Sequence, residues 1–155
     1  PGLGALNNGG LAIVLSVSCG SAGDCAAGGW YSTPLTEEGF VALEKNGRWG
    51  AAIEVPGLAV LTKGGFDSQV NSVSCGSAGS CAVGGDYANK RQGSEGFVAV
   101  ERNGRWGTAA EVPGLTALNK SGMSGVNVVS CASAGNCVAG GAYGDPHGPK
   151  GFVSG

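Results

Sequence analysis

The chain has 155 residues, of which only 13% are charged, and its formal net charge at neutral pH is −2. Charges so few and so balanced exclude the basic surface with which proteins bind nucleic acids or anionic membranes, so we expect neither partner. No apolar run approaches the roughly 18 to 20 residues of a membrane span, and no signal-like leader opens the chain. The 32 glycines occupy fixed places without a collagen-like period, which indicates turns and β-bulges rather than disorder.

All six cysteines belong to three copies of one motif, in which five residues separate two cysteines. The copies begin at Cys19, Cys75 and Cys131, 56 residues apart in both steps. A motif that recurs at a fixed period of this size marks an internal structural repeat.

The motif predicts a disulfide within each copy, because the five intervening residues form a tight turn that brings the flanking cysteines to bonding distance. Paired cysteines beside a single histidine, without a Cys-x-x-Cys motif, favour disulfides over a metal site, and we expect no metal and no cofactor. Disulfides in turn indicate a secreted or cell-surface protein. Reduced buried cysteines and zinc ligation are the alternatives. The predicted bridges are Cys19–Cys25, Cys75–Cys81 and Cys131–Cys137.

Each repeat opens with Pro-Gly-Leu and a turn, and four predicted strands follow. The first strand alternates β-branched and small residues, and the small residues of the second indicate tight packing against a neighbour. Asn46-Gly47 and Asn103-Gly104 predict a two-residue hairpin between the third and fourth strands, because both positions of its turn need a positive φ. In the first repeat the predicted strands cover residues 13–18, 25–31, 39–44 and 49–55.

The segment between the second and third strands is the one that varies among the copies in length and character. It is polar and contains prolines, as exposed loops do, and loops of this kind carry binding residues. The three loops cover residues 32–38, 88–95 and 144–150.

The pattern predicts an all-β protein made of four-stranded antiparallel meanders, with repeats at 1–55, 56–112 and 113–155. A lone meander cannot bury its faces, so the copies must pack on one another, and the architecture that stacks such units is the β-propeller. The third repeat stops within its third strand and lacks the last one. Three blades are fewer than the usual four to eight, so we expect either a longer ring or self-association through open strand edges.

At SCGSAGDCAAGG, GFVALEKNGRWG and EVPGL the chain resembles the cysteine-containing β-propeller repeats found in tandem in secreted and surface proteins of actinobacteria and related soil bacteria. These repeats are grouped loosely with sialidase-like (BNR) and kelch-type propellers. The resemblance covers the whole chain and implies a propeller fold and a bacterial source, but it implies little about a ligand.

Two features of catalytic sialidases are missing. The Asp-box pattern is not matched, because the turn before Trp49 carries Asn46-Gly47 in place of the pattern. No arginine triad is evident either, since Arg48 and Arg105 are repeat positions and the remaining arginines, Arg91 and Arg102, are scattered. A fragment of a sialidase-like glycosidase or lyase is therefore only an alternative interpretation.

Few residues of the chain are candidates for a catalytic role. The single histidine, His147, lies in the variable loop of the third repeat, where nothing arranges a serine and an aspartate beside it. Paired carboxylates serve glycosidases, but the glutamates that could form such pairs are copied with the repeat, which favours a structural role. We therefore predict that the chain is not an enzyme. These glutamates are Glu44, Glu101, Glu54 and Glu111.

Six aromatic residues are candidates for ligand binding. Tryptophans at the start of the fourth strand either stack on sugar rings or anchor the packing between repeats, and the tyrosines that end the second strand have the same two interpretations. Trp30 differs, because Asp86 and Ala142 replace it in the other copies and the fold does not require it. The six candidates are Trp30, Tyr31, Trp49, Trp106, Tyr87 and Tyr143.

Two functional classes follow from these features. A non-catalytic extracellular module would bind a glycan or a protein partner through its three unlike loops. A structural surface protein would instead use its open edges and low charge to assemble into rings or fibres.

Overall fold

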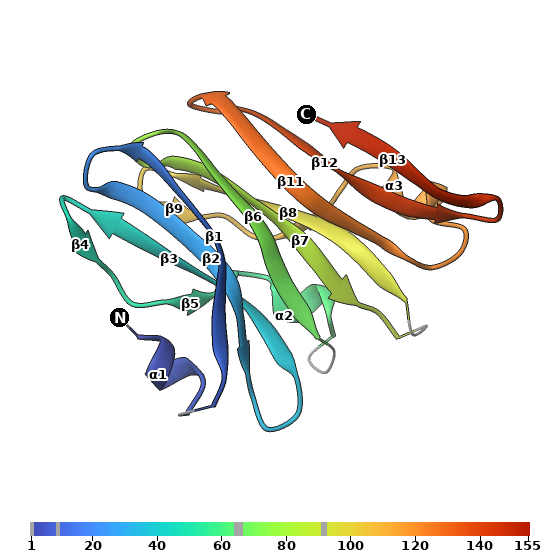
Figure 1. The fold of residues 1–155 in the computed structure, drawn as a ribbon, viewed down its shortest axis with the longest axis horizontal. Coiled ribbons are helices and arrows are strands. Elements are labelled where there is room, and N and C mark those ends of the chain that lie inside the picture. Colours follow the sequence, from blue (N-terminus) through green and yellow to red (C-terminus); the bar gives the residue numbers. More distant parts are fainter. Residues whose placement is uncertain (1, 9, 64–66, 91–92) are drawn as a thin grey trace.

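The structure, a computed structural model, describes residues 2–8, 10–63, 67–90 and 93–155. The chain is all-β, as predicted: its described part forms three antiparallel sheets that lie side by side in chain order (Figure 1). None of the helices in these ranges is long and apolar enough to cross a membrane. Pro1 and Arg91 lie outside the described residues.

The sheets are meanders in which each long strand pairs with the next one along the chain. The first sheet contains β1 (Ala12–Ser21), β2 (Asp24–Ser32), β3 (Glu37–Lys45), β4 (Arg48–Trp49) and β5 (Ile53–Glu54). The second contains β6 (Ser68–Ser77), β7 (Ser80–Ala88), β8 (Ser94–Arg102), β9 (Arg105–Trp106) and β10 (Ala110–Glu111). The third contains β11 (Ser124–Ser133), β12 (Asn136–Asp145) and β13 (Gly148–Ser154). Each sheet is thus built from the strands of one predicted repeat.

Three local features differ from the sequence prediction. The segment predicted as the third loop, residues 144–150, lies mostly within β12 and β13, and its turn covers only Pro146 and His147. The turn that opens each repeat contains one turn of helix: α1 (Leu3–Leu6), α2 (Leu58–Leu61) and α3 (Leu115–Leu118). The predicted fourth strand is also split into two short strands in the first and second sheets. After β4, the Gly50 N–H donates to the Leu43 carbonyl, 2.8 Å away, and the chain leaves the ladder before β5 rejoins β3.

The predicted disulfides are confirmed, and the described residues include no free cysteine. In each sheet the two cysteines face each other across the first pair of strands, as Cys19 and Cys25 do in β1 and β2. Because directly opposite side chains on one face of an antiparallel pair are close neighbours, the strand register itself brings the thiols together.

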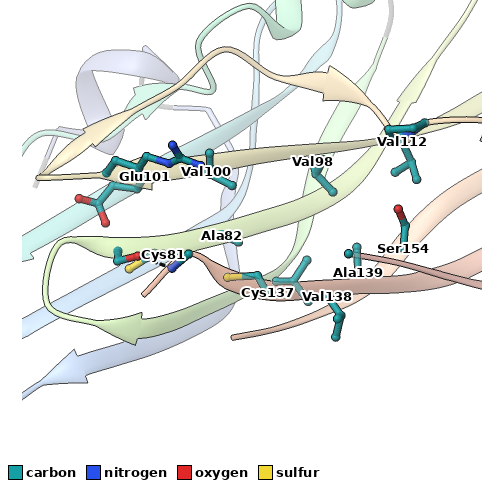
Figure 2. Close-up of a pocket in the computed structure, with 16 residues that line it drawn as sticks. Cys81, Ala82, Val98, Val100, Glu101, Val112, Cys137, Val138, Ala139 and Ser154 are labelled. Carbon is teal, nitrogen blue, oxygen red and sulfur yellow. Dashed lines mark hydrogen bonds between the residues drawn. The ribbon is translucent and has the colours of Figure 1, made fainter. Parts of the chain in front are cut away.

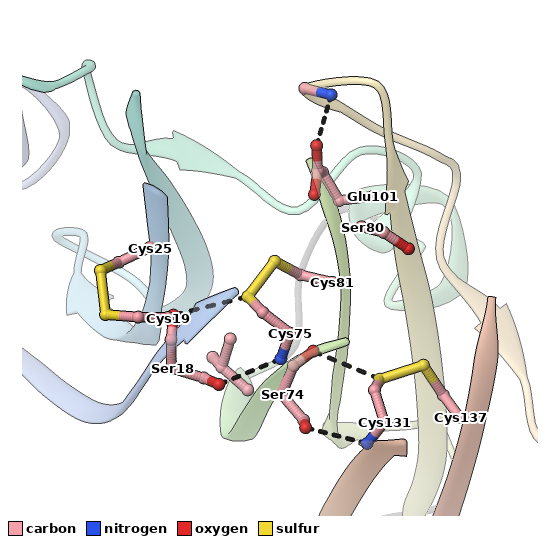
Figure 3. The surroundings of a disulfide bond; sticks show 12 residues. Ser18, Cys19, Cys25, Ser74, Cys75, Ser80, Cys81, Glu101, Cys131 and Cys137 are labelled. Carbon is pink, nitrogen blue, oxygen red and sulfur yellow. Dashed lines mark hydrogen bonds between the residues drawn. A yellow bond between two sulfur atoms is a disulfide. The ribbon is translucent and has the colours of Figure 1, made fainter. Parts of the chain in front are cut away.

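Serine hydroxyls join the first strands of adjacent sheets, β1, β6 and β11, which are named the inner strands. The Val73 N–H donates to Ser16 Oγ and the Cys75 N–H to Ser18 Oγ, both at 3.0 Å, so β6 is tied to β1. The same two bonds recur between β11 and β6, where Ser74 Oγ accepts from the Cys131 N–H at 2.9 Å (Figure 3). The inner strands of adjacent sheets are therefore joined by the same two hydrogen bonds at both interfaces.

One glycine in the second strand of the first sheet, and its counterpart in the second sheet, allow the sheets to approach closely. A Cβ built on Gly28 would lie 2.6 Å from Cγ1 of Val70 in the next sheet, and one built on Gly84 would lie even closer to Cγ1 of Val126. These valines are fully buried. Each valine thus fills a space that exists only because its partner has no side chain, which confirms the tight packing expected of this strand.

The apolar core is divided among the interfaces. One cluster lies between the first and second sheets, and a smaller one lies between the second and third. A third cluster belongs to the first sheet alone: it includes Tyr31 and Phe40, and Leu3 and Leu6 of α1 pack against it.

Candidate functional site

A polar hollow of about 560 Å³ opens at the end of the molecule that carries the one-turn helices and the predicted loops. It lies between the end of α2, the end of α3 and the loop that follows β7. This volume is within the usual range of small-molecule sites. The charged side chains and the tyrosine that line it are Lys63, Tyr87, Lys90, Glu95, Glu111 and Lys120.

Tyr87 is the aromatic residue in the lining of this hollow. Its ring is buried in the core between the first two sheets, and its Oη donates a 2.5 Å hydrogen bond to Oε1 of Glu111. Thr116 Oγ1 donates to the other oxygen of the same carboxylate at 3.3 Å. The carboxylate is thus held by donors from β7 and from α3.

Burial raises the pKa of the Tyr87 hydroxyl, and the hydrogen bond to Glu111 and the negative charges of Glu111 and Glu95 raise it further. The hydroxyl therefore keeps its proton throughout the physiological pH range and acts as a fixed donor. The Glu111 carboxylate accepts hydrogen bonds from this hydroxyl and from Thr116 of α3, one at each of its oxygens.

Glu95 supplies a second positioned carboxylate. Its Oε1 accepts from Asn89 Nδ2 at 3.3 Å, and its Oε2 accepts from Ser124 Oγ at 3.1 Å. Asn119 Nδ2 donates to Ser124 Oγ at 3.2 Å, so the end of α3 supports this arrangement. Both carboxylates of the hollow are oriented by side chains before any ligand arrives.

Three lysines complete the polar lining, namely Lys63, Lys90 and Lys120. Ammonium groups only donate hydrogen bonds and carboxylates only accept them, so the hollow offers both kinds of group to a ligand. In the described parts of the chain, no group of three or more His, Cys, Asp or Glu side chains is placed to hold a metal ion.

The first sheet contains a related cluster at equivalent positions. Burial raises the pKa of Tyr31, and the charges of Glu54 and Glu38 raise it further. The pKa of Glu54 is also raised, by burial first and by Glu38 second. A tyrosine with two glutamates therefore recurs in the first two sheets, whereas the third has Lys150 opposite its tyrosine, Tyr143.

The six predicted ligand-binding aromatics do not gather at one place. Tyr87 lines the hollow described above, and Tyr143 lines another of about 430 Å³. Tyr31 is buried, Trp30 is half-buried, and the two remaining tryptophans pack against apolar clusters. The surroundings of Trp49 and Trp106 thus favour the packing alternative, and ligand binding by these six residues stays a prediction.

Asp86, the counterpart of Trp30 in the second sheet, connects three strands. Its Oδ1 accepts from Gln69 Nε2 at 3.2 Å and from Asn71 Nδ2 at 2.8 Å. Asn71 Nδ2 also lies 3.0 Å from the Val126 carbonyl of the third sheet. Asp86 therefore helps to join the second and third sheets through Asn71. Its position in the sequence alone did not indicate this role.

The residues considered for catalysis lie apart in the structure. His147 is exposed in the turn between β12 and β13, where its backbone N–H donates to Oδ1 of Asp145 at 2.9 Å. Glu101 is fully buried, with Oε1 accepting from the Gly104 N–H of its own hairpin. Burial raises the pKa of Glu101, opposed by backbone N–H groups and by Lys45.

A second, apolar cavity of about 300 Å³ lies between the second and third sheets (Figure 2). Val98 and Val100 line it from β8, and Cys137 and Ala139 line it from β12. It offers few polar groups that could orient a ligand. The polar hollow is therefore the stronger candidate for a ligand-binding site.

Sequence reasoning missed the lining of the polar hollow. It considered Glu111 only as a repeated carboxylate and did not connect it with Tyr87 or with Glu95. The sequence did contain a signal for this site, because a tyrosine and two glutamates recur at equivalent positions of the first two repeats. No protein-family model matches the chain, and no curated protein matches it either. A functional assignment therefore depends on the geometry of this hollow.

Proposed function

We propose that the chain is a non-catalytic, extracellular repeat module of the β-propeller type that binds a neutral glycan in the hollow between α2 and α3. The observation that carries the proposal is the pair of pre-oriented carboxylates, Glu95 and Glu111, beside the permanently protonated hydroxyl of Tyr87.

The propeller assignment is supported by the stacking of the sheets. Three meanders follow one another in chain order, and their first strands β1, β6 and β11 are joined by equivalent hydrogen bonds. A propeller requires this repetition of one meander about an axis, with the first strand of each blade innermost. The three disulfides support a secreted or cell-surface location, because such bonds persist in oxidising compartments.

The mixed polarity of the hollow supports a glycan as the ligand. Sugar hydroxyls both donate and accept hydrogen bonds, and they match a lining with carboxylate acceptors and lysine donors. Two carboxylates close to three lysines provide no single strong sign of charge, which favours a neutral sugar over an anionic one. Three lining residues, Asn89, Lys90 and Glu95, also come from segment 88–95, whose sequence varies among the repeats in length and character.

Calorimetric titration with cellotetraose, chitotetraose and xylotetraose tests this proposal. We expect at least one of them to bind, and we expect Tyr87→Phe and Glu111→Gln each to weaken binding by roughly tenfold, because each removes a hydrogen bond that involves a charged group. The matched controls are Tyr31→Phe and Glu54→Gln, which change the same positions of the first sheet. Absence of binding by all three sugars, or equal losses in the control variants, would contradict the proposal.

A further inference from the structure

The first and third sheets each have one face that no other sheet covers. On the first sheet, Val14 and Val17 occupy the positions that Val70 and Val73 occupy on the second. Val73 is only 6% exposed because the first sheet covers it, whereas Val17 is 55% exposed. The front face of the first sheet, defined by Val14 and Val17 of β1, therefore presents the same apolar residues without a partner.

The back face of the third sheet shows the complementary difference. Val153 occupies the position of Val41, which the second sheet covers completely; Val153 is 85% exposed and Val41 is 0% exposed. Val138 is likewise exposed, while its counterpart Ala26 in the first sheet is fully buried. The back face, defined by Val138, Val153 and Gly140, is thus apolar and open.

The two open faces have matching shapes. At both internal interfaces, a valine from the front of one sheet fills the space over a glycine on the back of the preceding one: Val70 over Gly28, and Val126 over Gly84. The equivalent glycine of the third sheet is Gly140. Its nearest neighbour is Val128 of its own sheet, with the position of a Cβ 3.4 Å from Val128 Cγ1, and no valine of another sheet reaches it.

Two serine hydroxyls accept hydrogen bonds at each internal interface, and the back face of the third sheet has a counterpart for only one of them. Ser130 occupies the place of Ser18 and Ser74, whose hydroxyls accept from the cysteine N–H of the next sheet. It is available to accept from the equivalent N–H, that of Cys19. Val128, however, replaces Ser16 and Ser72, so the second hydroxyl acceptor is missing.

We propose that the front face of the first sheet in one copy of this chain docks onto the back face of the third sheet in a second copy, repeating the internal interface between chains. The contact is head-to-tail, because it joins two different faces, and its repetition forms either a closed ring or an open chain of copies. Both faces are apolar, and burying valines that are otherwise half or more exposed provides the driving force. The missing hydroxyl at Val128 makes this contact weaker than the internal ones. The inference is independent of the glycan site.

The test measures mass by light scattering over a range of concentrations of the full 155-residue chain. We expect mass above that of one chain, falling on dilution. Val17→Asp and Val153→Asp should each weaken association at least tenfold, because each would bury an unpaired carboxylate at the contact. Both side chains are exposed within one chain, so the sheets should still fold, which circular dichroism and disulfide mapping check. Leu35→Asp, in an exposed loop away from both faces, is the control.

Mixing the two aspartate variants distinguishes a head-to-tail contact from a symmetric one. Each variant keeps one intact face, so an equal mixture should form a one-to-one dimer that grows no further. Val128→Ser should strengthen association by roughly threefold to tenfold, because it restores one hydrogen bond. A wild-type chain that stays monomeric at all concentrations, or a mixture that stays monomeric while the wild type associates, would overturn the proposal.

Discussion

The two interfaces between sheets share the contacts of their inner strands, β1, β6 and β11. They differ in the packing of the outer strands, which are the short strands at the end of the first and second sheets, such as β9 and β10. Between the first and second sheets, Trp106 and Ala109 from the outer part of the second sheet join a continuous cluster with Val41 of the first. Between the second and third sheets, the corresponding space is the apolar cavity of about 300 Å³. Among the described residues, the third sheet contains no strand at the place of β9 and β10.

This comparison separates two contributions to the stacking. The serine hydrogen bonds and the valine–glycine contacts of the inner strands are equivalent at both interfaces, with or without the outer strands. The inner strands therefore determine how the sheets are placed, and the outer strands determine how completely the space between them is filled. Four predictions sharpen this comparison, in order of decreasing effect.

The largest effect is expected where the sheets approach most closely. Gly84→Ala should lower the free energy of unfolding by about 2–3 kcal/mol, because the new methyl group would overlap Val126 in a well-packed core. Gly28→Ala should have a similar effect through Val70. Gly140→Ala is the matched control: it meets only an ordinary contact at 3.4 Å, so we expect a change within about 0.5 kcal/mol.

Denaturant unfolding of the monomeric chain measures these differences. If Gly84→Ala and Gly140→Ala had equal effects, the valine–glycine contact would not determine the approach of the sheets. The same Gly140→Ala variant should weaken the association between copies, since it fills the space proposed for Val14 and Val17.

The cavity provides the second test. Val83 and Ala139 occupy equivalent positions in β7 and β12, and Val83 is fully buried in the filled interface. Val83→Ala should lower the free energy of unfolding by about 2 kcal/mol, because it leaves a void. Ala139→Val should raise it by up to about 1 kcal/mol, because Ala139 lines an existing cavity that can take the two methyl groups.

Thermal unfolding of both variants checks this prediction, with xenon binding as a direct probe of the cavity. A loss of stability in Ala139→Val would mean that the space is not available to a larger side chain. The comparison between the two interfaces would then need another explanation.

The serine ladder gives the third test. Ser18→Ala and Ser74→Ala should each lower the free energy of unfolding by about 1 kcal/mol, since each leaves a cysteine N–H without its acceptor. The effects should be alike, because the inner contacts are equivalent at the two interfaces. Ser130→Ala, on the open face, should leave the stability of a single chain unchanged, and a denaturant series on the three variants measures the difference.

The smallest effect concerns the buried carboxyl group of Glu101. Its pKa is raised in the folded chain, so the folded state holds a proton that the unfolded state has already released. This group's contribution is fully present below its ordinary pKa, and it declines as the pH rises toward the raised value. Glu101→Gln should remove that decline, so the variant gains stability relative to the wild type between acidic and neutral pH.

Unfolding free energies measured at several pH values would show the change of slope. Glu44→Gln, at the equivalent and half-buried position of the first sheet, controls for the loss of a carboxylate from this hairpin. Parallel pH profiles for the wild type and Glu101→Gln would mean that the Glu101 carboxyl group does not titrate in this range.

Much of the fold was predictable because its determinants are local. The spacing of Cys19 and Cys25 around a tight turn was enough to pair them, and alternating residues on either side indicated the strands. Asn46 and Gly47 adopt the positive φ values that the predicted hairpin turn needs. The split of the fourth strand was not predictable, because it depends on the contact of the Gly50 N–H with β3.

By itself, the sequence determined the repeat, the three disulfides and the antiparallel meanders, because each depends on residues that are neighbours along the chain or across one turn. Only the tertiary structure decided which side chains of equivalent repeats are buried. Val17 and Val73 occupy the same position in their repeats, yet one is exposed and the other is covered by a neighbouring sheet. The hollow at Tyr87 and Glu111 likewise joins residues 24 positions apart. Burial and desolvation depend on neighbours from distant parts of the chain, so a repeated sequence can predict a repeated backbone but not the environment of each copy.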